Sequence, residues 1–131
     1  MSAVETLQEA VVAALEANAF IADTVSGIYD GPPPRAPYPY IAIGGGVATD
    51  WSTKSARGRE VHVALTIWDD GEVPARLHAL VAAVEEAFET LPRNLSGWHV
   101  AGVTFLRSLI ARDANGPWAG IVEHRVRMSE I

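Results

Sequence analysis

YPYIAIGGGVATDWSTKSARGREVHVALTIWDD, residues 38–70, is the stretch that decides the fold of this chain. Two apolar runs, 40–43 and 61–68, lie on either side of a polar segment rich in glycine, serine, threonine and basic residues. In the second run, apolar residues recur at every second position, which is typical of a strand with one buried face. The stretch therefore predicts two strands joined by a long β-hairpin loop at about residues 47–59.

A loop of this length is unusual in a small domain, where hairpin loops have about two to five residues. Ordering it costs conformational entropy, and contact with a partner is a common reason to keep such a loop. It holds three of the ten basic residues beside a tryptophan, and Trp and Arg are favoured at interface centres. We therefore expect an interface to a partner protein, formed by Asp50, Trp51, Ser52, Thr53, Lys54, Arg57 and Arg59. The alternative is a solvated hairpin tip whose Trp51 folds back on the sheet.

The composition predicts one globular domain over residues 1–131, since 49% of the residues are hydrophobic and 20% are charged. Sixteen acidic and ten basic residues give a net charge of −6, which argues against a surface that broadly grips a nucleic acid backbone. The chain has no cysteine, which excludes disulfides and thiolate metal sites. Neither a signal peptide nor an apolar run approaching about 18 residues is recognisable, so we expect synthesis in the cytoplasm and no membrane contact.

Helical periodicity predicts one helix before the two strands and one after them. Ser2 and Glu5 have the spacing of a capping box, and the helix that follows is expected to end near residues 17–18. A second helix is predicted by apolar residues at helical spacing: Leu77, Leu80, Val81, Val84 and Phe88. Residues 98–112 and 118–128 predict two more strands, joined by residues 113–116, where Asn-Gly is a strong hairpin signal.

The expected fold is therefore α+β, in the order α-β-β-α-β-β, with a four-stranded, mainly antiparallel sheet and two helices packed on one of its faces. A short helical turn is expected at residues 20–24, before a proline-rich segment at residues 32–39. Proline fixes φ and lacks an amide hydrogen, so this segment is expected to be an extended connector.

The third strand, residues 98–112, is apolar on both faces if its side chains alternate strictly. Val103, Phe105 and Leu109 then share one face, and the opposite face is apolar as well, with Val100, Leu106 and Ile110. Two helices cover only one face of such a sheet. The second apolar face is therefore covered either by a neighbouring subunit or by loops of the same chain.

The sequence offers little catalytic chemistry. His62 and His124 fall on strands and could be neighbours, but no carboxylate follows either one at a metal-ligand spacing. Gly44–Gly46 is not followed by the Lys and Ser or Thr of a phosphate-binding loop, and no helix begins there. No Gly-x-Ser-x-Gly motif occurs. We therefore expect a protein that works by contact, with no enzymatic activity, no cofactor, no metal and no catalytic residue.

Short motifs along nearly the whole chain resemble the tail terminator, or tail completion, proteins of long-tailed phages, prophages and gene transfer agents, a family long catalogued as of unknown function. The matches are Pro39-Tyr40-Ile41 with Ile43-Gly44, Asp50-Trp51-Ser52-Thr53-Lys54 with Gly58 and Glu60, then Leu65, Ile67 and Trp68, Leu91-Pro92 with Leu95 and Gly97, and Asp113 with Gly116. Their order and spacing carry the resemblance. The proline-rich connector departs from the family pattern.

The resemblance implies a structural virion protein that forms a ring, commonly a hexamer, at the head-proximal end of the tail tube. The implied partners are other copies of the chain, the tail tube protein and a head–tail connector or stopper protein. The protein would act in the host cytoplasm during assembly and then remain at the head–tail junction. We also hypothesise from the net charge that DNA passes through the ring lumen without specific binding.

Two alternatives remain open at the level of sequence. One is another neck component, such as a head completion or stopper protein. The other is a small-molecule-binding α+β domain, which a deep pocket joining His62 and His124 would favour.

Overall fold

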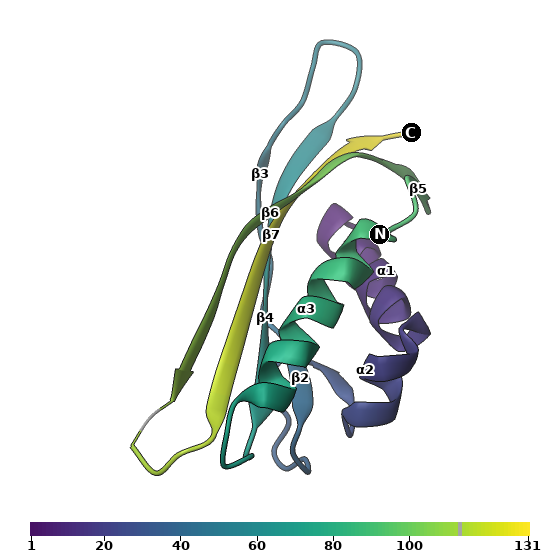
Figure 1. Cartoon of the computed structure of the whole chain (residues 1–131). Coiled ribbons are helices and arrows are strands. Elements are labelled where there is room, and N and C mark those ends of the chain that lie inside the picture. Colours follow the sequence, from purple (N-terminus) through teal and green to yellow (C-terminus); the bar gives the residue numbers. More distant parts are fainter. Residues whose placement is uncertain (113) are drawn as a thin grey trace.

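The computed structural model describes residues 1–112 and 114–131. Three helices lie against one face of a single curved sheet of seven strands (Figure 1). The elements are α1 (Ala3–Ala17), α2 (Ala19–Thr24), β1 (Ile28–Asp30), β2 (Tyr40–Ile43), β3 (Val47–Asp50), β4 (Gly58–Asp69), α3 (Ala75–Glu89), β5 (Asn94–Leu95), β6 (Trp98–Arg112) and β7 (Trp118–Glu130). Asp113, which the sequence places in the last hairpin, lies outside the described residues.

The mixed α+β class is confirmed, and the short helical turn expected at residues 20–24 is α2, but four strands are too few and the predicted element order is wrong. The sequence does not predict β1, β3 and β5, which have three, four and two residues. None of the three contains a buried residue. Backbone pairing with a longer neighbour holds such strands, and a hydrophobic pattern carries no signal for it.

The strands lie in the order β1-β2-β4-β7-β6-β5, and β3 pairs with β4 next to β2. All the pairs are antiparallel except β1 with β2. Ile43 lies opposite Leu65 and Val47 lies opposite His62, so four steps along one strand face three along β4. Residues 44–46, all glycine, therefore form a bulge that joins β2 and β3 into one interrupted strand.

Residues 47–59, expected as a loop, are strand at both ends, and the loop itself comprises only residues 51–57. All four side chains of β3 are exposed, so burial does not mark this strand in the sequence. Its register with β4, from Val47 opposite His62 to Asp50 opposite Arg59, extends the hairpin instead.

The core lies between the helices and the inner face of the sheet. The predicted helical stripe is buried, as are the alternating residues of β4 and β7: Leu77, Leu80, Val81, Val84, Phe88, Val61, Val63, Leu65, Ile67, Val122, Val126 and Met128. Each large side chain taken fully out of water contributes on the order of 1.5–3 kcal/mol of transfer free energy.

Polar contacts fix the ends of the helices. The Glu5 amide donates to Ser2 Oγ at 3.1 Å, and the Ile21 amide donates to Asn18 Oδ1 at 3.1 Å, so α1 and α2 both begin at side-chain caps. Asp69, which is 1% exposed, accepts a hydrogen bond from Arg76 Nε at 2.9 Å. This contact ties the end of β4 to the first turn of α3.

β6 carries two bulges, one after Val100 and one after Phe105. Each bulge adds an unpaired residue and resets the alternation of side chains. By register with β7, Val103, Phe105 and Ile110 face the helices, whereas Leu109 faces the other way. The predicted faces are therefore wrong for Leu109, and also for Val100 and Ile110, which strict alternation places on the face opposite Val103 but which lie on the same face as it.

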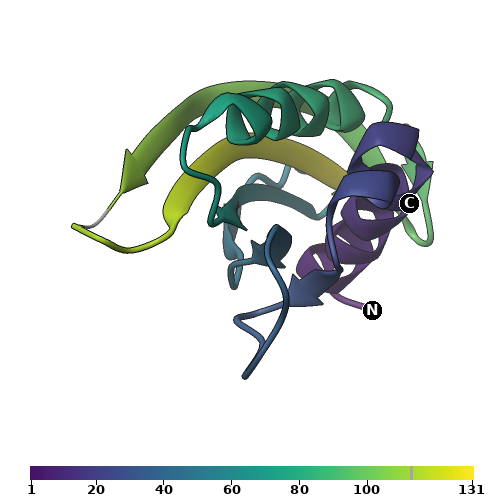
Figure 2. The ribbon, with the colours of Figure 1, turned by 60° about the horizontal axis from the view of Figure 1, so that its bottom comes forward.

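The sheet is strongly curved, and the far ends of β6 and β7 extend past the helices (Figures 1 and 2). Over the described residues, no helix is long and apolar enough to cross a membrane.

Candidate interaction surfaces

The hairpin of β3 and the start of β4, residues 47–60 and here called the arm, projects beyond the helices at one end of the molecule (Figure 1). Its tip is ordered by its own hydrogen bonds. Ser52 Oγ donates to Asp50 Oδ1 at 2.5 Å and accepts from the Gly58 amide at 3.0 Å. The Thr53 amide donates to the Ala56 carbonyl at 2.9 Å. A tip built this way is structured without a partner.

All seven expected interface residues lie together on the arm, but they have different contacts. Asp50 lies 3.4 Å from Arg59 Nη1, and a hydrogen bond from Ser52 is the main cause of its lowered pKa. Trp51 folds back on the sheet, where the Arg127 guanidinium lies 5.7 Å from its ring centroid. The exposed residues of the tip are Ser52, Thr53, Lys54, Ser55 and Arg57.

The face of the sheet opposite the helices, here called the far face, carries a network of ion pairs. Glu60 accepts from Arg127 Nε at 2.9 Å and lies 3.6 Å from Arg125 Nε. His62 Nε2 lies 2.8 Å from Glu123, which is also paired with Arg107. The bond from Arg107 is the main cause of the lowered pKa of Glu123. The middle of this face is therefore charged, and not apolar as the sequence indicates.

His62 and His124 lie on neighbouring strands but on opposite faces of the sheet. Val63, and not His62, lies opposite His124 in the register of β4 with β7. His62 is on the far face, while His124 points toward α3 and stacks on Phe88. The pocket joining the two histidines, which would favour a small-molecule-binding domain, does not form. Among the described residues, no group of three or more His, Asp or Glu side chains is arranged to hold a metal ion.

β6 leaves apolar side chains exposed along one edge of the sheet. Phe105, Leu106 and Leu109 are 48%, 42% and 45% exposed. On the outer side of β6 the described pairing is with β5 alone, at His99 and Trp98, so the edge beyond is open along most of its length. Open edges and exposed apolar side chains are typical of strands that meet a partner.

A cleft of about 290 Å³ opens between α3 and β6, where the strand curves away from the helix. Charged side chains of the α3 end and apolar side chains of β6 surround it, and its lining consists of Glu85, Phe88, Glu89, Arg93, Val103, Phe105 and His124. His124 is 2% exposed and stacks on Phe88 with 3.8 Å between ring centroids. Its Nδ1 is buried and has no hydrogen-bond partner among the described residues. Burial lowers the pKa of His124 to about 4.

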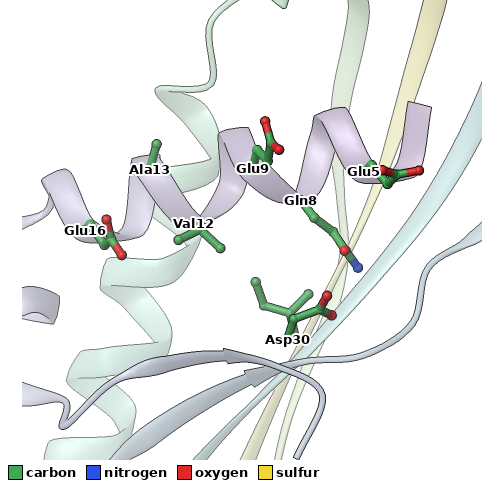
Figure 3. A pocket seen from close by; sticks show the side chains of 8 residues that line it. Glu5, Gln8, Glu9, Val12, Ala13, Glu16 and Asp30 are labelled. Carbon is green, nitrogen blue, oxygen red and sulfur yellow. The ribbon is translucent and has the colours of Figure 1, made fainter. Parts of the chain in front are cut away.

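A second, more open groove of about 430 Å³ lies between α1 and β1. Gln8 and Asp30 point toward one another across it, and Glu9 points away (Figure 3). Four of its eight lining residues are acidic: Glu5, Glu9, Glu16 and Asp30. This edge of the sheet therefore has a strongly negative local charge.

The sequence points to the arm but not to the cleft. His124, Phe105 and Phe88 meet there only because the bulge after Phe105 sets the register of β6 on β7. The double-sided apolar character of residues 98–112 is the signal that this strand lacks full cover.

Comparison with known proteins gives consistent matches along the chain. The model of a family described as tail completion protein gp17 matches residues 9–129. The tail completion protein gp17 of Bacillus phage SPP1 is 26% identical over 110 residues, which cover 84% of this chain and 81% of that protein.

Two solved structures share the fold. A chain from the virion of a native gene transfer agent particle superposes with a TM-score of 0.83 at 27% identity, over 98% of this chain and 99% of that one. The structure of the bacteriophage SPP1 gp17 protein superposes with a TM-score of 0.64 at 26% identity, over 98% of this chain and 91% of that one.

Proposed function

Since this chain belongs to the tail completion protein gp17 family, we propose that it forms a ring that caps the tail tube and joins the tail to the head connector. The coarser statement follows from membership itself: the chain is a structural protein of a phage or gene-transfer-agent tail. The observation that carries the proposal is the superposition on a chain of an assembled particle over nearly its full length, with a TM-score of 0.83.

A ring requires that different surfaces of one copy meet different surfaces of the next, because such head-to-tail contacts close when the rotation between copies divides a full turn. The chain offers two unlike edges for this purpose. The β6 edge is long and apolar, whereas the groove beside β1 is acidic. We take the ring to be a hexamer, and its copies to be single domains over residues 1–131.

The arm is proposed to contact the tail tube protein or a neighbouring subunit. Its seven candidate residues divide into those that shape the arm, Asp50, Trp51, Ser52, Thr53 and Arg59, and those that present exposed side chains from it, Lys54 and Arg57. Only the second group is expected to lose binding without loss of fold. DNA is proposed to pass through the ring lumen without specific binding. The charge of the helices supports this, since α1 has three acidic residues, α2 has one and α3 has three, whereas Arg76 is the one Lys or Arg residue on these three helices.

The test is reconstitution with purified tail tube protein. The wild-type chain is expected to bind one end of the tubes and to appear there as a ring in electron micrographs. The double variant Lys54→Ala/Arg57→Ala should keep the circular dichroism of the wild type and lose tube binding. Tubes that bind neither protein, or that bind the variant as well as the wild type, would contradict the proposed cap or the proposed arm contact respectively.

The second candidate function is that of a head completion or stopper protein. The open β6 edge would serve this role equally well, but the chain would then lie nearer the head. Pull-down with purified tube protein against purified portal or connector protein separates the two. A chain that retains the portal and ignores the tube belongs to the second role. No enzymatic activity is proposed, since the family name and the surfaces both describe assembly.

A further inference from the structure

We propose that the proline-rich connector of one copy, residues 31–39, docks in the cleft between α3 and β6 of the next copy, with Tyr38 entering beside His124. This inference rests on the proposed ring, and it names the two surfaces that meet within it. The cleft and the connector belong to opposite edges of the sheet, beside β6 and between β1 and β2. Contacts of this kind join copies head to tail.

The cleft has the character of a receptor for a polar aromatic group. His124 is nine-tenths or more buried, yet its Nδ1 lacks a partner among the described residues, and such a group costs stability until something bonds to it. Phe88 stacks on one face of the imidazole, and Phe105 meets it edge-on at 5.6 Å. Phe105 is 48% exposed, so its ring offers a free surface for another aromatic ring.

The connector has the character of a ligand. It contains four prolines within residues 32–37, which hold it extended and lower the entropy that docking costs. Ser26 fixes it to the body, donating from Oγ to the Pro37 carbonyl at 2.6 Å and from its amide to the Pro39 carbonyl at 2.8 Å. Tyr38 is 41% exposed and stacks on Tyr40 with 5.6 Å between ring centroids. The Tyr38 side chain is therefore exposed at the surface, on a backbone that hydrogen bonds hold in place.

The chemistry of the two surfaces is complementary. A tyrosine hydroxyl both donates and accepts, so it can pair with the His124 Nδ1 in either neutral tautomer once the exposed Phe105 ring beside it turns aside and uncovers this buried nitrogen. Arg35 is the basic residue of the connector and is exposed, and Glu85 and Glu89 stand at the end of α3 beside the cleft. A guanidinium between two carboxylates provides direction and attraction on the rim. Arg93 also lines the cleft, which limits the acidic character to the α3 side.

The chain lacks cysteine, so single engineered thiols give an unambiguous test. The Arg35→Cys and Glu89→Cys proteins carry different tags and are mixed under mild oxidation. The mixture is tested both in solution, at concentrations high enough for the chain to oligomerise, and in the presence of tail tubes. A disulfide forms only where Cα atoms approach within about 7 Å, and mixing two single variants detects contacts between copies alone. We expect disulfide-linked heterodimers of this pair of variants to exceed by at least tenfold those of two control pairs. The controls are Lys54→Cys with Glu89→Cys, and Arg35→Cys with Glu9→Cys.

The role of the hydroxyl is tested in the same system. Tyr38→Phe should weaken association about fivefold, the scale of one neutral hydrogen bond, and Tyr38→Ala by more, while Phe20→Ala, at a comparably exposed aromatic residue, changes nothing. In a His124→Leu background, Tyr38→Phe should have no further effect, because the two changes then remove one interaction.

The inference is overturned if coupling of the Arg35→Cys and Glu89→Cys proteins does not exceed the controls, or if Tyr38→Ala associates like wild type. If the Lys54→Cys protein instead forms disulfides with the Glu89→Cys protein, the arm of the neighbouring copy, and not its connector, occupies the cleft. Rings that form and bind tubes without coupling between the connector and cleft thiols leave the proposed function intact and refute only this contact. Chains that neither form rings nor bind tubes refute the proposed function as well.

Discussion

Acidification from pH 7 to pH 4.5 should destabilise the monomer mainly through His124. The folded-state pKa of this group is lowered to about 4 by burial, while its ordinary value is 6.5. As the pH falls through 6.5, His124 becomes protonated in the unfolded chain but stays neutral in the folded chain. The free energy of unfolding therefore decreases until the pH reaches the folded-state pKa. The gap of about 2.5 units corresponds to about 3 kcal/mol in all, and about 2–3 kcal/mol of it is lost by pH 4.5.

The carboxylates act in a different pH window. Hydrogen bonds from Arg76 and Arg107 are the main causes of the lowered pKa values of Asp69 and Glu123. A carboxyl group with a lowered pKa adds stability above its unfolded pKa and loses it as the pH falls through the folded value. Most of that loss therefore lies at and below about pH 4.5. Carboxylates such as Glu85 and Glu89, which line the same cleft, would raise an imidazole pKa, whereas the pKa of His124 is lowered, and burial is the cause.

The assay is urea unfolding followed by tryptophan fluorescence, at several pH values between 7 and 4.5 and at concentrations where the chain is monomeric. The free energy of unfolding of wild type should fall by about 2–3 kcal/mol more than that of His124→Leu, whose side chain does not titrate. Parallel pH profiles for the two proteins would refute the assignment of a buried, neutral imidazole at this position.

Three further substitutions test the fold by urea unfolding. Arg76→Ala leaves the nearly buried Asp69 carboxylate without its guanidinium and should cost about 2 kcal/mol, with Arg76→Lys losing less. Gly58→Ala places a Cβ 2.1 Å from a carbonyl oxygen across the arm and should cost about 2 kcal/mol or more, whereas Gly45→Ala, with open space around it, should change little. Phe88→Ala should cost about 3–5 kcal/mol and remove the ring that stacks on His124.

Sequence patterns predict the elements that bury a continuous face. The stripe of α3 and the alternation of β4 both reflect the burial that drives folding, and both are confirmed residue by residue. The predicted Ser2 cap similarly rests on a local hydrogen bond within a few residues. These features depend on short-range spacing, which a single sequence displays directly.

The errors arise where pairing, and not burial, decides the structure. β3 has four exposed side chains and is a strand only because β4 pairs with it across the glycine bulge. In β6, a bulge after Phe105 moves Leu109 to the far face, so a strict period of two assigns it to the wrong side. His62 and His124 are separable only through the register of β4 on β7, which no local pattern contains.

The same bulges give a reason for the open cleft. A bulge bends its strand and increases the local twist, and β6 with two of them curves away from α3 while β7 stays covered. Without the bend, Phe105 would lie against α3 and would close the space beside the buried His124 imidazole. The sheet is curved (Figure 2), and the proposed contact between copies uses the cleft beside its β6 edge. It follows that deleting Leu106, the unpaired residue of the second bulge, should straighten β6, close the cleft to Tyr38 and abolish association between copies while the helices stay folded.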